Sequence, residues 1–218
     1  MISFKVYLII FICISLFTII SSFIITRLGL EKEYNQKVKL DIKSEKMNML
    51  EERLSDFLRA NQLGKTTDVY KIASALKISE AGEDSSISDQ AILSDPDEFG
   101  NRTVTFKKGL TTEKKNFAYA HECAHLINGD GNMGPHTRPD KYNKLPIEQL
   151  ADYTAAAILL PKDEIYEYLE DKNYEKLPPR KRVNVIHSLC RKYQVGDVLV
   201  LRRIKEVYEL KRASFTSE

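Results

Sequence analysis

The chain has 218 residues, and its 33 Lys and Arg nearly balance its 31 Asp and Glu, for a net charge of +2. Three cysteines cannot all pair, so the composition excludes a disulfide framework and indicates reduced thiols. The part after the apolar N-terminal segment has about 190 residues, which can bury one hydrophobic core. The sequence therefore predicts one domain of modest size.

The N-terminal segment contains an uninterrupted run without a charged side chain, residues 6–26, between Lys5 and Arg27. At about 1.5 Å per residue, a helix of this length spans the hydrocarbon core of a bilayer. A secretory signal peptide is the alternative, but its apolar core is normally about 7–15 residues long and a small-residue cleavage site follows it. We therefore expect a membrane anchor over residues 1–26 and a single-pass membrane protein. The basic residues after the run favour a cytoplasmic location for the remainder.

Residues 27–63 are rich in charge, with apolar residues at positions 47, 50, 54 and 57. This spacing is heptad-like, but two repeats are too few for a coiled coil, so it predicts a helical stalk whose end packs on the domain. Asp68 and the threonines before it then favour a helix that starts at Val69. The stalk is thus expected to end before residue 64.

Residues 80–100 are acidic and rich in turn-forming residues. The short apolar run 91–93 between the turns predicts one strand of a hairpin, which returns over residues 102–107. Thr111 and Thr112 are good N-cap residues, and Asn128-Gly129 is a normal C-terminal stop. A helix is therefore expected between them.

The sequence HECAH, residues 121–125, lies within this expected helix. Residues four positions apart lie on one helix face, so His121 and His125 can bind one metal ion, for which zinc is best suited. Glu122 lies off that axis but within reach of a water on the metal, which indicates a general base. Cys123 points away and is expected to be a small buried residue. The alternative is an amphipathic helix with two buried, hydrogen-bonded histidines.

A catalytic zinc site uses three protein ligands and leaves a fourth position to water. Glu148 fits the third position, in a second helix that Pro146 is well placed to begin. The helix dipole alone would also favour a carboxylate there. Asp152 lies one turn further on the same face and could accept the free N–H of a ligating histidine. The pair of carboxylates therefore favours a metal site over a dipole effect.

Three more helices are expected after Pro161, over residues 162–170, 180–193 and 197–211. From residue 172 onward, 12 Lys and Arg stand against 5 Asp and Glu, a net of +7. Such a segment could contact nucleic acid or anionic lipid. Its apolar stripe instead favours basic helices, residues 172–218, that pack on the core with Arg202 and Arg203 facing water. Nucleic acid is therefore not the expected partner.

The HECAH helix and the segment from Glu148 to Pro161 resemble the ImmA/IrrE-type metallopeptidases, whose second block has the form E-x-x-A-N-x-F-A-x-x-L-L-M-P. This chain has Asp152, Thr154 and Leu160 where the family usually has Asn, Phe and Met, and Ala for the usual Gly at position 124. None of these departures removes a ligand or the base. The resemblance implies an α+β fold: a mostly helical, zincin-like catalytic domain with a small β-sheet, here preceded by one transmembrane helix.

Residues and resemblance together predict a membrane-anchored zinc endopeptidase with its metallopeptidase core over residues 64–171. His121, His125 and Glu148 would hold Zn²⁺, with Mn²⁺ as the alternative, while Glu122 acts as base and Asp152 orients one histidine. The resemblance implies a protein substrate, such as a helix-turn-helix repressor. Two alternatives remain: a non-catalytic membrane-attached module that binds a protein or nucleic acid, and the toxin of a toxin–antitoxin pair.

Overall fold

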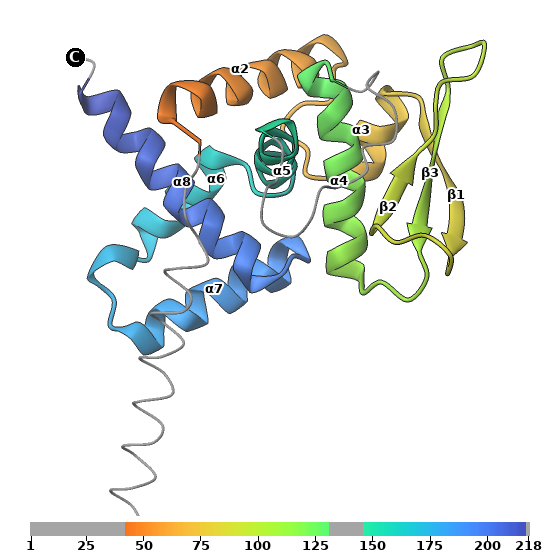
Figure 1. Ribbon diagram of the computed structural model, residues 1–218. Coiled ribbons are helices and arrows are strands. Elements are labelled where there is room, and N and C mark those ends of the chain that lie inside the picture. The colour runs from red at the N-terminus through yellow and green to blue at the C-terminus, as the bar shows by residue number, and fades with distance from the viewer. Residues whose placement is uncertain (1–41, 131–145, 217–218) are drawn as a thin grey trace, which may run out of the picture. The chain divides into compact units, whose positions relative to one another are not determined.

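The computed structural model describes residues 42–130 and 146–216, which lie in one unit of the chain, Leu40–Glu218 (Figure 1). These residues form a mostly helical α+β domain with a three-stranded sheet at one side. The predicted fold class is thereby confirmed for this part of the chain. The expected anchor, residues 1–26 with its helix 6–26, lies outside the described residues.

The expectation of a single-pass membrane protein with a cytoplasmic domain is not upheld. Among the residues that the structure describes, no helix has both the length and the apolar character needed to cross a bilayer. The 20-residue helix α8 (Asp197–Thr216) is long enough, but charged residues recur along it, among them Arg203 and Glu206. This finding contradicts the predicted single-pass membrane location, which is therefore withdrawn.

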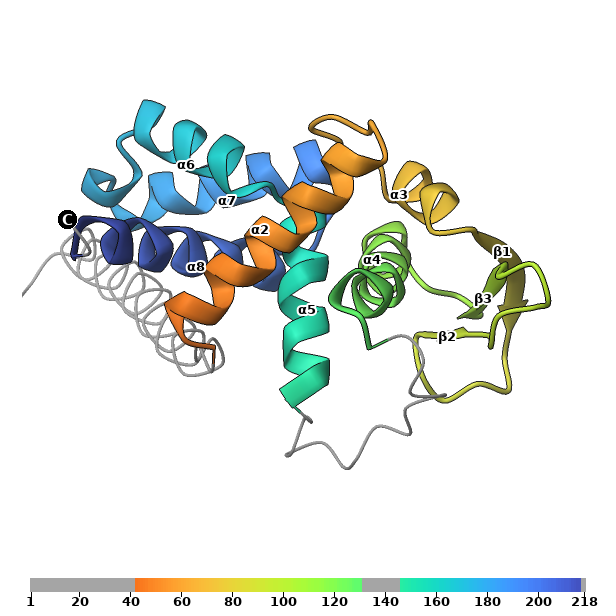
Figure 2. The same ribbon diagram turned by 90° about the horizontal axis from the view of Figure 1, so that it is seen from above.

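Helix α2 (Ser44–Ala60) contacts α4 (Thr112–Asn128), α5 (Pro146–Leu159) and α8, and Figure 2 shows it lying across α5. Its buried residues are Met47, Leu50 and Leu54, three of the four positions of the heptad-like spacing. That apolar stripe therefore faces the domain core. The described end of the segment 27–63 is thus part of the packed domain.

The sheet has the strand order β1-β3-β2. It consists of β1 (Ile78–Asp84), β2 (Ala91–Leu93) and β3 (Arg102–Lys107), and it follows helix α3 (Val69–Ala75). Strands β2 and β3 pair antiparallel, which confirms the predicted hairpin, whereas β1 pairs parallel to β3 and was not predicted. The reason lies in its sequence, because all but one of its side chains are exposed or half-buried and it lacks the apolar alternation of a strand.

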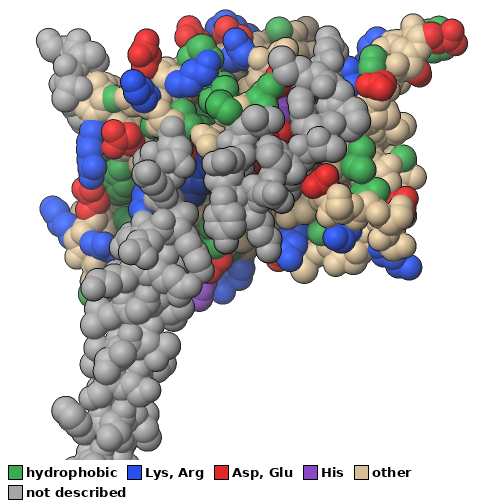
Figure 3. Space-filling model, viewed as in Figure 1, with side chains coloured by type: hydrophobic (Ala, Val, Ile, Leu, Met, Phe, Trp, Pro, Cys, Tyr) green, Lys and Arg blue, Asp and Glu red, His purple; other side chains and the backbone are tan. Residues whose placement is uncertain are grey.

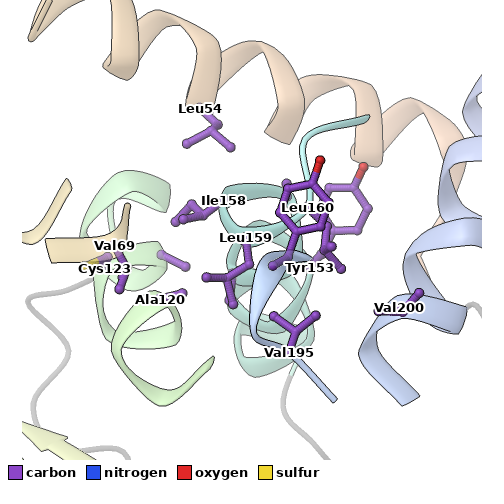
Figure 4. Packing of buried hydrophobic residues seen from close by; sticks show 14 of the residues in the cluster. Leu54, Val69, Ala120, Cys123, Tyr153, Ile158, Leu159, Leu160, Val195 and Val200 are labelled. Atoms are coloured by element: carbon purple, nitrogen blue, oxygen red, sulfur yellow. The ribbon is translucent and has the colours of Figure 1, made fainter. Parts of the chain in front are cut away.

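Helix α5 (Pro146–Leu159) is the centre of the domain, and from Ala151 to Leu159 each of its residues is buried. Helix α4 (Thr112–Asn128) lies beside it and packs its other side against β2 and β3. In Figure 4, side chains of α5 and of Leu160 lie between those of α4 and those near the start of α8. Helix α5 has no solvent-exposed polar face over residues 151–159 because other parts of the domain surround it.

The C-terminal part folds as α6 (Lys162–Asp171), a 3₁₀ turn (Tyr174–Lys176), α7 (Pro179–Tyr193) and α8, in agreement with the three expected helices. Its basic residues do not all face solvent. Arg182 donates to the carbonyl oxygens of Leu177 and Glu175, at 2.9 and 2.6 Å. On the face seen in Figure 3, basic and acidic side chains are interspersed. Some of the basic side chains of this segment thus make contacts within the domain.

Arg203 was expected to face water, but it is fully buried. Its guanidinium lies 2.6 Å from Glu51 Oε1 of α2 and 3.5 Å from Glu206 Oε2, and it donates to the carbonyl oxygen of Leu160 at 2.8 Å. The ring of Tyr153 lies beneath it, with 5.4 Å between the guanidinium carbon and the ring centroid. A helical periodicity cannot indicate such a role, because the partners come from three separate helices.

Replacing Arg203 with Leu should destabilise the domain by about 3–5 kcal/mol, since the buried Glu206 and the partly buried Glu51 would lose their shared cation. The free energy of unfolding from denaturant titration measures the effect. Arg212→Leu is the matched control, because Arg212 is exposed on the same helix and should change stability by less than about 0.5 kcal/mol. Equal stability of both variants would refute a structural role for the buried cation.

Candidate metal centre

His121 and His125 lie one turn apart on α4, and both side chains are buried. Their Nε2 atoms are 3.1 Å apart, and their rings meet at an interplanar angle of 81°. The helix continues through both positions, as the sequence predicted. The two imidazoles therefore present one nitrogen each to the same point.

Glu148 reaches that point from the first turn of α5. Its Oε2 lies 3.2 Å from His121 Nε2 and its Oε1 lies 3.6 Å from His125 Nε2, and the side chain is buried. The packing of α5 beside α4 thus brings Glu148 to two histidines that lie more than 20 positions earlier in the sequence. Within the described residues, they form a His, His, Glu group whose ligand atoms all lie within 4.8 Å of one another.

The dimensions of this group fit a tetrahedral metal ion. Bonds of about 2.0–2.1 Å at tetrahedral angles place neighbouring ligand atoms roughly 3.3–3.4 Å apart. The three separations here, 3.1, 3.2 and 3.6 Å, lie on both sides of that value. Two neutral imidazoles and one carboxylate are also a donor set that zinc prefers. The group can therefore hold one divalent ion and leave a fourth position to water.

Asp152 lies one turn beyond Glu148, and its Oδ1 is 3.0 Å from His121 Nδ1. When this carboxylate accepts the Nδ1 hydrogen, Nε2 is left free to bind a metal. Burial disfavours the charged form of His121, but the carboxylates of Asp152 and Glu148 outweigh it and raise the pKa of the ring to about 9. The site thus carries a negative field that attracts a proton or a metal cation alike.

Asp130 holds the second histidine and was not predicted. Its Oδ1 lies 3.2 Å from His125 Nδ1. The turn that ends α4 places it there: Gly129 has a φ of 86°, its N–H donates to Leu126 O, and the N–H of Asp130 donates to His125 O. This is a Schellman motif, which folds the chain back over the last helical turn. The signal in the sequence was an Asp directly after the expected Asn-Gly stop.

Glu122, the predicted base, is half-buried on the same turn of α4. It lies close enough to His121 for its charge to contribute to the raised pKa of that ring, after the larger effects of burial, Asp152 and Glu148. Its carboxylate is not part of the ligand group. Glu148 can therefore bind the ion, while Glu122 is left able to exchange protons.

Cys123 is fully buried between α4 and the rest of the core, and burial raises the pKa of its thiol well above the usual range. A thiol in that state is a small apolar residue and not a metal ligand. This agrees with the prediction that Cys123 is a small buried residue.

The end of α4 is fixed by contacts from two other helices. Thr154 of α5 donates to Asn128 Oδ1 at 3.0 Å, and Arg53 of α2 donates to the Asn128 carbonyl oxygen. The Thr at position 154, where the resembled family usually has Phe, thus binds the residue that precedes the Schellman turn. These contacts hold the turn that carries Asp130.

The family model of the IrrE N-terminal-like domain (Peptidase_M78) matches residues 81–205, more than half of the chain. No curated protein matches the sequence. Among solved structures, a Mycobacterium tuberculosis transcriptional regulator is similar, with 19% sequence identity and a TM-score of 0.48. The alignment covers 72% of this chain and 46% of the regulator, so the chain spans less than half of the regulator's length.

Substituting Asp130 by Ala should weaken the binding of Zn²⁺ by about 10- to 100-fold, because His125 loses the acceptor that orients its ring. Competition with a chromophoric chelator measures the dissociation constant. Asp95→Ala removes an exposed Asp elsewhere and should leave the affinity unchanged. If both variants bind zinc like the unchanged protein, Asp130 has no part in the site.

Zinc should also stabilise the fold, since a cation would neutralise several carboxylates that lie buried side by side. At a free concentration about 100 times the dissociation constant, the gain is about 2.7 kcal/mol. Thermal unfolding with excess zinc and after chelation measures it. Glu148→Gln should lose most of the shift, and a shift of full size in that variant would place the ion elsewhere.

Proposed function

The chain belongs to the IrrE N-terminal-like (Peptidase_M78) family, and from this premise we propose that it is a zinc-dependent endopeptidase that cleaves a regulatory protein. The observation that carries the proposal is the convergence of His121, His125 and Glu148 at separations suited to a tetrahedral ion. The family model supports a peptidase activity, and the donor set supports zinc as the metal.

The proposed reaction divides the work among the residues of α4 and α5. When bound, the ion would polarise the substrate carbonyl and lower the pKa of a water toward about 7. Glu122 takes the proton from the attacking water and passes it to the leaving amine. Asp152 and Asp130 each accept the Nδ1 hydrogen of one histidine, so that both rings keep the orientation that ligation needs.

Strand β2 is the part of the sheet that we propose to meet an extended substrate. It is an edge strand of three residues, it pairs only with β3 within the described sheet, and α4 packs against it. A segment of substrate could add to such an edge through backbone hydrogen bonds, which select an extended conformation more than a particular sequence. A protein substrate with an accessible, unfolded segment suits this arrangement.

Glu122→Gln should lower the rate of peptide hydrolysis by about 10²- to 10⁴-fold while zinc remains bound, because the amide cannot accept the proton. Cleavage of an unstructured protein and metal content of the same preparation are measured together. Glu167→Gln, an exposed change on α6, is the control. Full activity of Glu122→Gln would refute the proposed base.

The substrate can be sought by comparing new protein N-termini in cells that express the unchanged protein or Glu122→Gln. The proposal expects termini that depend on Glu122 to arise in a transcriptional regulator, such as a helix-turn-helix repressor. If control of gene expression is the same with both proteins, the chain acts by binding and not by cleavage.

A further inference from the structure

We propose that Arg202 of α8 is a positioning residue for the metal centre, which holds the carboxylate of Asp152 so that it orients His121. The inference rests on the proposed metal site and extends it to a helix that supplies no ligand. Its basis is a row of ion pairs that leads from Asp152 into the core of the domain.

The carboxylate of Asp152 has a different partner on each oxygen. Its Oδ1 lies 3.0 Å from His121 Nδ1, and its Oδ2 lies 3.7 Å from Arg202 Nη1. Only 4% of Asp152 is exposed and the side chain of Arg202 is partly buried, so water screens the contact with His121 poorly and the contact with Arg202 in part. The contact with Arg202 is too long for a hydrogen bond and is therefore an ion pair. It favours one orientation of the carboxylate plane.

Arg202 is itself held by a second carboxylate. Its Nε donates to Glu206 Oε1 at 2.8 Å, one turn further along α8. A guanidinium carries several donors in one rigid plane, so Nε can bind Glu206 while Nη1 faces Asp152. The ammonium group of a lysine is a single point and cannot occupy both positions with the same geometry.

Glu206 is fixed in turn by the buried cation beneath it. Its Oε2 lies 3.5 Å from Arg203 Nη1, and Arg203 is bound by Glu51 of α2. Charges therefore alternate in sign along the row, from Asp152 through Arg202, Glu206 and Arg203 to Glu51. Each side chain is restrained by a neighbour of opposite charge, so the orientation of Asp152 depends on helices on the far side of α5.

An experiment on the full-length chain can isolate this role. Arg202→Gln removes the cation but keeps a polar side chain, and we expect the dissociation constant of Zn²⁺ to rise about 10-fold, the lower end of the range for residues that orient ligands. The visible absorption bands of bound Co²⁺ should shift, because they report the geometry of the ligands. Arg202→Lys should give an intermediate affinity, and Arg212→Gln on the same helix should match the unchanged protein.

A double variant tests whether Arg202 acts through Asp152. In the Asp152→Asn background position 152 has no negative charge for Arg202 to hold, so adding Arg202→Gln should change zinc affinity by less than about 2-fold. An equal loss in both backgrounds, accompanied by a lower stability of the metal-free protein, would overturn the proposal in favour of a general structural role.

Two further outcomes separate this inference from the proposed function. If the unchanged protein binds neither Co²⁺ nor Zn²⁺, the metal site itself is wrong, and the role of Arg202 is refuted along with it. If the unchanged protein binds both ions and Arg202→Gln has the same affinity and the same Co²⁺ spectrum, the metal site stands and the role of Arg202 alone is refuted.

Discussion

The candidate site depends on one packing contact, that of α4 against α5. Fully buried alanines lie on both helices, Ala120 and Ala124 on α4 and Ala151 and Ala155 on α5. Small side chains at four-residue spacing let two helices approach closely along their length. Only such an approach brings a carboxylate from the start of α5 to the two imidazoles. A larger residue at these positions would force the two helices apart and so separate the ligands.

The same contact concentrates charge in a place where water is scarce. Glu148, Asp152 and Asp130 are all buried within a few ångströms of two histidines. Uncompensated carboxylates in such surroundings are costly, and their presence opposes the stability that the apolar core provides. A divalent cation would offset this cost. The arrangement is therefore better explained by metal binding than by two buried histidines that merely satisfy their hydrogen bonds.

The parts of the site that sequence could predict are those set by local geometry. His121 and His125 share a face in any regular helix, and the order Pro146, Glu148, Asp152 gives two carboxylates on one face of the next helix. Asp130 required knowledge of the turn after Gly129, since only the Schellman geometry returns it to His125. Strand β1 was missed because a polar edge strand lacks the periodicity on which such predictions rely. The membrane location was predicted from the apolar run at residues 6–26 and the basic residues after it, and no helix in the described part supports it.

The roles of Arg202 and Arg203 could not be predicted from the helical periodicity of apolar residues. The two are adjacent in sequence, and one charge is fully buried while the other spans two carboxylates at the edge of the core. A buried cation is tolerated only where partners converge, and here those partners come from α2, from the residue that follows α5 and from α8 itself. The cost of burying Arg203 is met by contacts that also fix Glu206, and through it Arg202. If Arg202 positions Asp152 as proposed, the stability of the domain and the geometry of its candidate metal centre depend on the same side chains.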